Sequence, residues 1–295
     1  MKLTRRNKQI FSSYAFLSVP IIWWGMFFLV PFFMALFFSF TNLKISMDAI
    51  TKTGFFQYKS VLTDADFWSA MRTTVIWTVA MMIGNNLFGV LMAILLVRLS
   101  KGRRIFLALL FWPTLVSAVV GSEITKTVFS ADATGLVNML IGLFGAKPVA
   151  WFEREGYALF SLMVMPFLFG FSIKMIIYYT SVMSIPSSYF EAARLETGSY
   201  SKIVRHITLP LIKNAFVLNI LLSLIDGLKV LGPMQLITKG ANGTQSSILY
   251  IYDYAFGTSS NMGKAAAAAF IVFAFILLAS VGQLLISGKG SETYE

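Results

Sequence analysis

The stretch EAARLETGSYSKIVRHITLP, Glu191–Pro210, is a polar segment in an otherwise strongly apolar chain. Its twenty residues hold two carboxylates, Glu191 and Glu196, and four cations if His206 is counted. Long apolar runs lie before and after it. Two explanations fit such an insert: a plain loop between apolar segments, or a surface through which another molecule acts on the chain.

The composition of the whole chain indicates an integral membrane protein. Of 295 residues, 57% are hydrophobic and 13% are charged, whereas about a quarter of the residues in soluble domains are charged. The net charge of +11 does not indicate a nucleic-acid-binding face, because the cations cluster in short segments beside apolar runs. With no cysteine and a single histidine, His206, the chain is expected to hold no metal site and no catalytic residue.

Six apolar stretches are long enough to cross about 30 Å of hydrocarbon as helices rising about 1.5 Å per residue. They predict an all-α integral membrane protein with spans at Ser13–Phe40, Phe67–Val97, Ile105–Phe129, Tyr157–Tyr179, Ala215–Ile237 and Ala265–Ile286. The first run exceeds the apolar core of a signal peptide, and no small-residue cleavage site follows it. We therefore expect it to stay as a membrane anchor.

The distribution of lysine and arginine predicts the orientation. Four cations precede the first span, four lie in the 98–104 link, and four lie in the 181–214 link, which we term the polar insert. Lys289 follows the last span, and the longer loops of the other side hold three, two and two cations. Because positively charged loops stay in the cytoplasm, both termini and the polar insert are expected to be cytoplasmic.

Within the polar insert, the sequence predicts two short helices separated by a turn. Ser188 and Glu191 have the spacing of a capping box, which predicts a helix with Ser188 as its N-cap. Gly198 suits the C′ position after this helix, and a second helix over Ser201–Ile207 is expected to end before Pro210. These features fit an amphipathic helix on the membrane surface as well as a helix that a partner protein contacts.

The spacing in the polar insert resembles the EAA motif of the permease subunits of ABC importers. The string EAA at 191–193 is followed, at that family's distance, by I-x-L-P at 207–210. The family's glycine falls at Thr197, with a glycine one step later at Gly198. The resemblance implies a coupling helix seated in a groove of an ATPase subunit, with contact residues Glu191, Ala192, Ala193, Glu196, Gly198, Ile207, Leu209 and Pro210.

The resemblance covers nearly the whole chain and points to the carbohydrate branch of that family, the maltose-type permeases. SIPSSYFEAARLE at 184–196 looks like the branch's IP-x-x-x-x-EAA-x-x-D, with Glu196 in place of the usual aspartate. The segment 227–256 is similar to its FK-x-F-D…LT-x-GGP…Y-x-Y-x-x-AF region, although GGP is replaced by GAN. The implied fold is that of type I importer permeases, a MetI-like core of six transmembrane helices with a cytoplasmic coupling helix.

The same resemblance implies an architecture and a set of partners. Residues 1–66 would form the N-terminal tail, first transmembrane helix and extracytoplasmic loop, residues 67–287 the ABC transporter transmembrane domain, and residues 288–295 a cytoplasmic tail. The partners would be a second permease subunit, with a sister chain favoured over a second copy, two ATP-binding subunits, and an extracytoplasmic substrate-binding protein. The expected location is the cell membrane of a prokaryote, either a plasma or an inner membrane, which the chain would cross several times.

No Walker A motif is present, since the nearest string, GQLLISGKG at 282–290, has the wrong spacing. ATP and Mg²⁺ are therefore expected on the partner subunits, with no cofactor in this chain. The expected function is a non-catalytic permease subunit for a sugar or oligosaccharide. The alternatives are a permease for a non-sugar solute and an ion-coupled secondary carrier; missing inverted repeats speak against the carrier.

Ionisable residues inside spans are functional candidates, because charge is costly to bury in lipid. Asp226 and Lys229 are three apart in the fifth span and are expected to pair on one helical face, either as a structural pair or within a solute path. The resemblance to maltose-type permeases implies a sugar path lined by Phe169, Gly170, Ser223, Asp226, Gly227, Lys229 and Val230.

Other polar residues in the spans are expected to have structural roles. Glu123 and Lys126 are expected to pair near the outer interface, and Lys174 to extend to the cytoplasmic interface. Asn85 and Asn86 are expected to form hydrogen bonds between helices.

Overall fold

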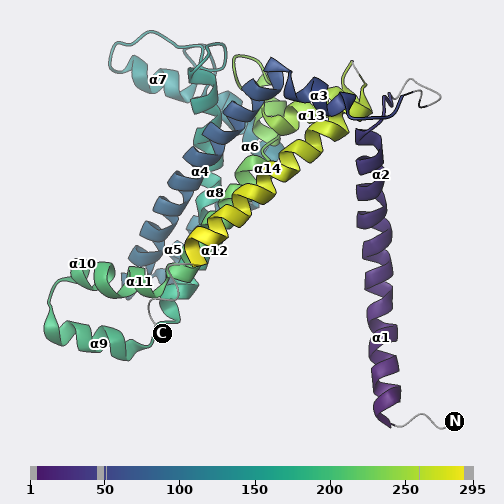
Figure 1. The fold of residues 1–295 in the computed structure, drawn as a ribbon. Coiled ribbons are helices and arrows are strands. Elements are labelled where there is room, and N and C mark those ends of the chain that lie inside the picture. Colours follow the sequence, from purple (N-terminus) through teal and green to yellow (C-terminus); the bar gives the residue numbers. More distant parts are fainter. Residues whose placement is uncertain (1–4, 45–49, 51, 259, 289–295) are drawn as a thin grey trace. The chain divides into compact units, whose positions relative to one another are not determined.

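The computed structural model describes residues 5–44, 50, 52–258 and 260–288. Within these residues the secondary structure is helical, apart from one isolated antiparallel bridge between Thr41 and Thr53 (Figure 1). The chain divides into two compact units, Met1–Asp64 with Ile251–Ile271, and Ala65–Tyr250 with Val272–Glu295. The expected domain limits stay a prediction, and residues 289–295 of the expected tail, with Lys289, lie outside the described residues.

Four of the six expected spans are continuous helices in the described residues. Four helices are long and apolar enough to cross a membrane: Phe16–Ser39, Ala65–Arg98, Tyr157–Met183 and Met262–Ser287. Two helix pairs meet the same criteria but are bent, by 93° for Arg103–Leu115 with Ala118–Val128, and by 68° for Tyr200–Leu211 with Lys213–Leu228. The all-α membrane architecture is therefore confirmed, with four spans in the described residues, or up to six if each bent pair is one span.

The first unit begins with a long apolar helix. It runs as α1 (Arg5–Trp24), a π-helical turn (Gly25–Leu29) and α2 (Val30–Ser39). Pro31 is the second residue after the π turn and has no N–H for a regular α-helical bond, so the wider turn accommodates the missing donor. The apolar side chains of Phe16–Phe33 are largely exposed within the chain, as suits a helix surrounded by lipid.

The rest of the first unit joins three helices through polar contacts. They are α3 (Phe56–Leu62), the end of α13 (Ser247–Phe256) and the start of α14 (Met262–Gly288). Lys264 Nζ lies 2.7 Å from Asp64 Oδ2, and the Gly263 N–H donates to the Leu43 carbonyl at 3.1 Å. A Cβ on Gly263 would collide with the carbonyl oxygen of Thr41. The glycine at the start of α14 therefore permits close packing against the residues that follow α2.

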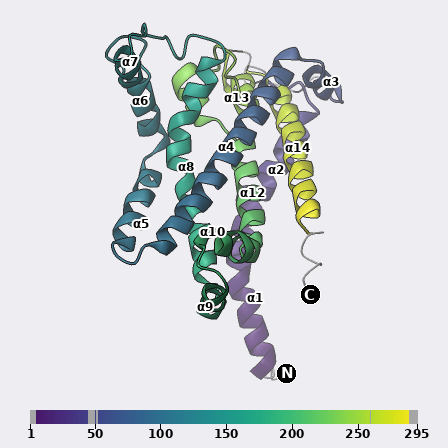
Figure 2. The same cartoon turned by 90° about the vertical axis from the view of Figure 1, so that its left-hand side faces the viewer.

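The core of the second unit consists of three helices that lie side by side (Figure 2). They are α4 (Ala65–Arg98), α8 (Tyr157–Met183) and α12 (Lys213–Leu228). One cluster of buried side chains between them contains Val90, Ala93, Leu96, Phe171, Met175, Tyr178, Val182, Ile212 and Ala215. Glycines bring the backbones close, since a Cβ on Gly227 would lie 2.8 Å from the Cα of Thr78.

The expected third span, Ile105–Phe129, is not one continuous helix. The chain forms α5 (Arg103–Phe111), a 3-10 turn (Trp112–Leu115) and α6 (Ala118–Val128). Pro113 cannot donate the hydrogen bond that a continuing α-helix requires. Ser117 then starts α6 as its N-cap, where its hydroxyl accepts a hydrogen bond from the Val120 N–H at 3.3 Å.

The expected fifth span, Ala215–Ile237, also ends early. Its helix α12 stops at Leu228, with Lys229 as the C-cap. Pro233 separates it from a π-helical turn, Met234–Thr238. Hydropathy cannot detect this break, because the residues on both sides of it are apolar.

Between α6 and α8 lies the short helix α7 (Leu136–Gly142). The buried amide of Asn138 fixes the surrounding loop: its Nδ2 donates to the Ser130 and Val149 carbonyls at 2.8 and 3.0 Å. Its Oδ1 accepts from the Trp151 Nε1–H at 2.9 Å.

Candidate functional site

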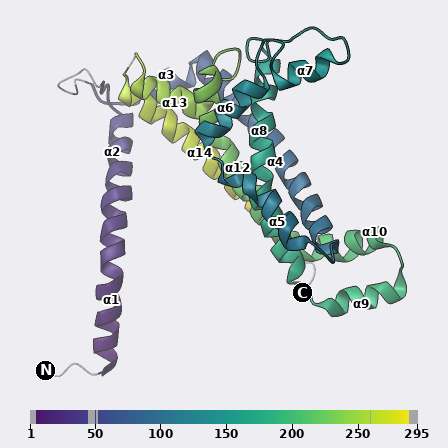
Figure 3. The same ribbon diagram turned by 180° about the vertical axis from the view of Figure 1, so that it is seen from behind.

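The polar insert folds as a pair of helical arms at one end of the second unit (Figure 3). Its elements are α9 (Ser187–Glu196), α10 (Tyr200–Ile203), a π-helical turn (Val204–Thr208) and α11 (Leu209–Leu211). In Figures 1 and 3, α9 and α10 lie at the end of the α4 and α8 bundle opposite to α7. The two expected short helices are present, although their ends differ from the prediction.

The capping box predicted for α9 is not formed. The helix begins at Ser187 with Pro186 as its N-cap, and no side chain caps its first turn. Proline suits this position because its ring fixes φ near the value that starts a helix. The side chain of Glu191 is exposed and forms no ion pair with any residue that the structure describes. Its carboxylate therefore remains open to a partner molecule.

Two further details of the polar insert differ from expectation. Gly198 is not in the left-handed conformation; α9 ends because Thr197 is extended, with φ −146° and ψ 131°. A threonine at this position is therefore compatible with the turn. The second helix does not end before Pro210 but continues to Leu211, because the π turn ahead of the proline accommodates its missing N–H.

Most residues that the sequence assigns to a partner contact are exposed. The exposed residues are Glu191, Ala192, Glu196, Gly198 and Pro210. Ile207 and Leu209 are half-buried, and Ala193 is buried. The sequence-based assignment omits Leu195, whose side chain is 91% exposed. Its spacing of four from Glu191 is the signal that places both residues on one helical face.

A second candidate site is a pocket of about 280 Å³ formed by α4, α8, α12 and the residues after α12, which we term the mid-span pocket. Its lining residues are Trp77, Met81, Asn85, Pro166, Gly170, Ile173, Lys174, Ser223, Asp226, Gly227, Val230 and Pro233. Five of the seven residues assigned to the sugar path are among them. Of the other two, Phe169 lines a separate pocket beside α6, and Lys229 lines neither pocket.

The ion pair of the mid-span pocket corrects two predictions. Lys174 Nζ lies 3.3 Å from Asp226 Oδ2, so Asp226 pairs with α8 and not with Lys229. Lys229 follows the last residue of α12 and no longer shares its helical face. Lys174 does not extend to the interface either, because its side chain is only 7% exposed. A lone lysine inside an apolar run is itself the signal for such a role.

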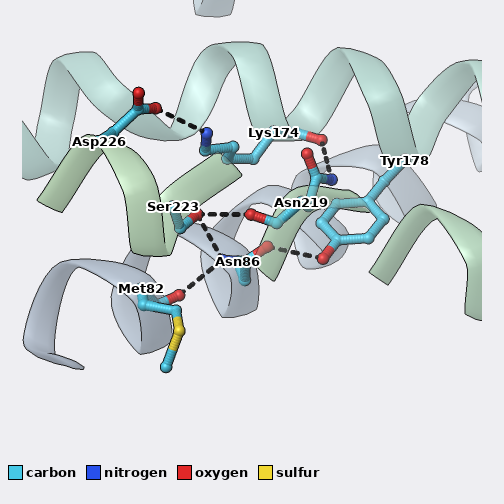
Figure 4. Close-up of polar contacts among 7 residues, drawn as sticks. All are labelled: Met82, Asn86, Lys174, Tyr178, Asn219, Ser223 and Asp226. Atoms are coloured by element: carbon cyan, nitrogen blue, oxygen red, sulfur yellow. Dashed lines mark hydrogen bonds and ion pairs between the residues drawn. The ribbon is translucent and has the colours of Figure 1, made fainter. Parts of the chain in front are cut away.

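A network of hydrogen bonds surrounds this pair and joins the three core helices (Figure 4). The Asn86 amide donates to the Ser223 hydroxyl at 2.9 Å, and the Tyr178 hydroxyl donates to Asn86 Oδ1 at 2.7 Å. The Asn219 amide donates to the backbone carbonyl of Lys174 at 3.2 Å. The predicted interhelical role of Asn86 is therefore confirmed.

Two other predictions concern residues outside this network. Glu123 and Lys126 form the expected pair, with 2.8 Å between Oε1 and Nζ. Asn85 lies beside Gly170 in the mid-span pocket, and its buried Oδ1 has no hydrogen-bond partner among the described residues. The interhelical bond predicted for Asn85 is therefore not formed through that oxygen.

Comparison with known proteins yields a family and several relatives. The family model described as binding-protein-dependent transport system inner membrane component matches residues 85–289. The multiple sugar-binding transport system permease protein of Streptococcus mutans is 30% identical over 282 residues, covering 94% of this chain and 95% of that protein. The arabinooligosaccharides transport system permease protein of Bacillus subtilis is 27% identical, covering 94% and 89%.

Solved structures share the fold. A chain of a bacterial ABC transporter involved in the import of the acidic polysaccharide alginate superposes with a TM-score of 0.86 at 20% identity. The match covers 96% of this chain and 97% of that one.

Proposed function

The chain belongs to the family of binding-protein-dependent transport system inner membrane components, and from this premise we propose the function of its two candidate sites. It is a multi-pass membrane protein and a permease subunit of a carbohydrate ABC importer, without ATPase activity of its own. With a second permease subunit, it forms the translocation path for a sugar or oligosaccharide that an extracytoplasmic binding protein delivers.

The observation that carries this proposal is the position and exposure of α9. This helix lies at the end of the core opposite to α7 and presents Glu191 and Leu195 on one exposed face (Figure 1). An apolar side chain beside an open carboxylate suits a groove that combines apolar contacts with a cationic side chain. We assign this face to an ATPase subunit, so that movement of the ATPase is transmitted through α9 to α8.

The mid-span pocket is the proposed part of the sugar path. It lies among the core helices and combines aromatic and apolar walls with the carboxylate of Asp226. Sugars require hydrogen-bond acceptors for their hydroxyl groups and apolar planes for their ring faces. Trp77 and Asp226 supply both kinds of contact.

The proposed assembly places the remaining chemistry on other chains. Two ATP-binding subunits hold ATP and Mg²⁺, and the second permease subunit is a sister chain of different sequence. The excess of lysine and arginine in the 98–104 link and in the polar insert supports a cytoplasmic location for α9 and for both termini. The membrane is the inner membrane of a prokaryotic cell.

Purification of the tagged chain from its native membrane tests this function. We expect ATP-binding subunits and a second permease to co-purify, and the complex to hydrolyse ATP faster when sugar-loaded binding protein is added. The matched control is the same complex with sugar-free binding protein. Sugar uptake by the chain in the absence of any ATPase subunit would contradict the proposal.

A further inference from the structure

The two charged groups that line the mid-span pocket are unequally exposed. The side chain of Asp226 is 69% exposed, whereas that of Lys174 is 7% exposed. Figure 4 shows Lys174 extending along α8 toward the carboxylate of Asp226. The pair is formally neutral, but its two charges do not face the same environment.

Close packing conceals the lysine. A Cβ on Gly89 would lie 3.2 Å from the Cβ of Lys174, so α4 covers the base of this side chain. Asn219 holds the backbone at the same residue by donating to the Lys174 carbonyl. Both residues line the pocket, but the carboxylate of Asp226 is much the more exposed of the two, and the ammonium contacts its Oδ2 at 3.3 Å. A solute in the pocket therefore approaches the carboxylate before the ammonium.

The other polar groups of the pocket carry no positive charge that would offset the exposed carboxylate of Asp226. The Ser223 hydroxyl donates to the Asn219 carbonyl at 2.7 Å and accepts from Asn86, so it is committed within the network. Asn85 contributes an amide whose oxygen is itself an acceptor without a donor among the described residues. Apart from Trp77, whose indole N–H is an uncharged donor, the remaining lining residues are apolar side chains and glycines.

We propose that the mid-span pocket selects solutes by charge: it admits neutral, hydroxyl-rich sugars and discriminates against acidic ones such as uronates, with Asp226 as the specificity-determining residue. The proposal rests on the proposed function and adds the substrate class. A carboxylate accepts strong hydrogen bonds from hydroxyl groups, and it repels a second carboxylate that enters the same pocket. Lys174 acts as a positioning residue that holds Asp226 in place.

Because the chain has no cysteine, a single introduced thiol can report the electrostatic potential inside the mid-span pocket. Ile173 lines the pocket next to Lys174, so Ile173→Cys introduces a single thiol there in the purified complex. The thiol is reacted with two methanethiosulfonates, a cationic one with a trimethylammonium-ethyl group and an anionic one with a sulfonato-ethyl group. Each rate is divided by the rate at which the same reagent reacts with free 2-mercaptoethanol. We expect the cationic reagent to be favoured about tenfold, because charged clefts change the encounter rates of ions by at least that factor.

Two substitutions at Asp226 distinguish an effect of its charge on the two reaction rates from an effect of misfolding. In the Ile173→Cys background, Asp226→Asn is expected to bring the normalised ratio close to one, and Asp226→Glu to retain the preference. Phe144→Cys is the matched control: this side chain is 90% exposed in the loop after α7, and its ratio is expected not to change with Asp226→Asn.

Three results would overturn the charge selection. They are equal rates for both reagents in the presence of Asp226, a preference that Asp226→Asn leaves unchanged, and no reaction at Ile173→Cys under conditions that label Phe144→Cys. The reaction needs neither ATP nor a sugar. Its outcome is therefore separate from the co-purification that tests the proposed function.

Discussion

Replacing Glu191 with alanine is expected to reduce ATP-driven sugar uptake by the assembled transporter about tenfold or more, while the chain still inserts into the membrane. The carboxylate is exposed on α9, and its removal would delete the charge-assisted hydrogen bond that we propose to a cationic ATPase side chain. Such a bond contributes about 1.5–3 kcal/mol, and each 1.4 kcal/mol corresponds to about tenfold in an equilibrium constant. Uptake into proteoliposomes and the amount of co-purified ATPase subunit are the two readouts.

The control for this substitution is Glu123→Ala. Glu123 also lies on a helix and is exposed, but it pairs with Lys126 on α6 and has no part in the proposed contact. An exposed pair of this kind contributes little, about 0–1 kcal/mol, so uptake should stay near that of the unmodified protein. Normal assembly and uptake with Glu191→Ala would contradict the contact role of Glu191.

Replacing Gly227 with alanine is expected to destabilise the chain by about 1–3 kcal/mol, because overpacking of a close contact forces backbone shifts. The added Cβ would lie 2.8 Å from the Cα of Thr78, and backbone atoms cannot rotate away as a flexible side chain can. The contact also lies next to the mid-span pocket, so the shift should displace Asp226 as well. The measurement is the thermal unfolding midpoint of the purified protein.

Gly282→Ala is the matched control for helix propensity. Gly282 lies within α14, and no atom lies within 4 Å of the position of an added Cβ. Alanine is better than glycine in a helix by up to about 1 kcal/mol, so this variant should be as stable as the unmodified protein or more stable. Equal stability of the two variants would show that the approach of α12 to α4 is looser than the structure indicates.

The spans could be predicted from hydropathy because each is set by a long local run of apolar residues. Their breaks could not, because Pro113 and Pro233 lie within apolar stretches whose hydropathy continues on both sides. A proline inside a membrane helix either breaks the helix or is tolerated within it. Which of the two occurs depends on how neighbouring helices pack against it. In the first span, a π turn accommodates Pro31 without a break.

At the candidate sites too, features set by spacing along one helix could be predicted, whereas contacts between helices could not. Five of the seven predicted path residues line one pocket: four belong to α8 and α12, and Val230 follows shortly after the end of α12. The partner of Asp226 was wrongly predicted, since spacing along α12 favoured Lys229, whereas the actual partner belongs to α8. Similarly, the S-x-x-E spacing of Ser188 and Glu191 predicts a capping box with Ser188 as the N-cap, but the N-cap is Pro186, two residues earlier.

The most direct test of the central claim is reconstituted transport. The chain and the proposed partners, a second permease subunit and ATP-binding subunits, are incorporated into proteoliposomes. Uptake of a labelled neutral oligosaccharide is measured with binding protein outside and ATP inside. We expect uptake against a concentration gradient that stops when ATP, the binding protein or this chain is left out. Undiminished uptake without ATP, or without this chain, would contradict the assignment of the chain as an importer permease.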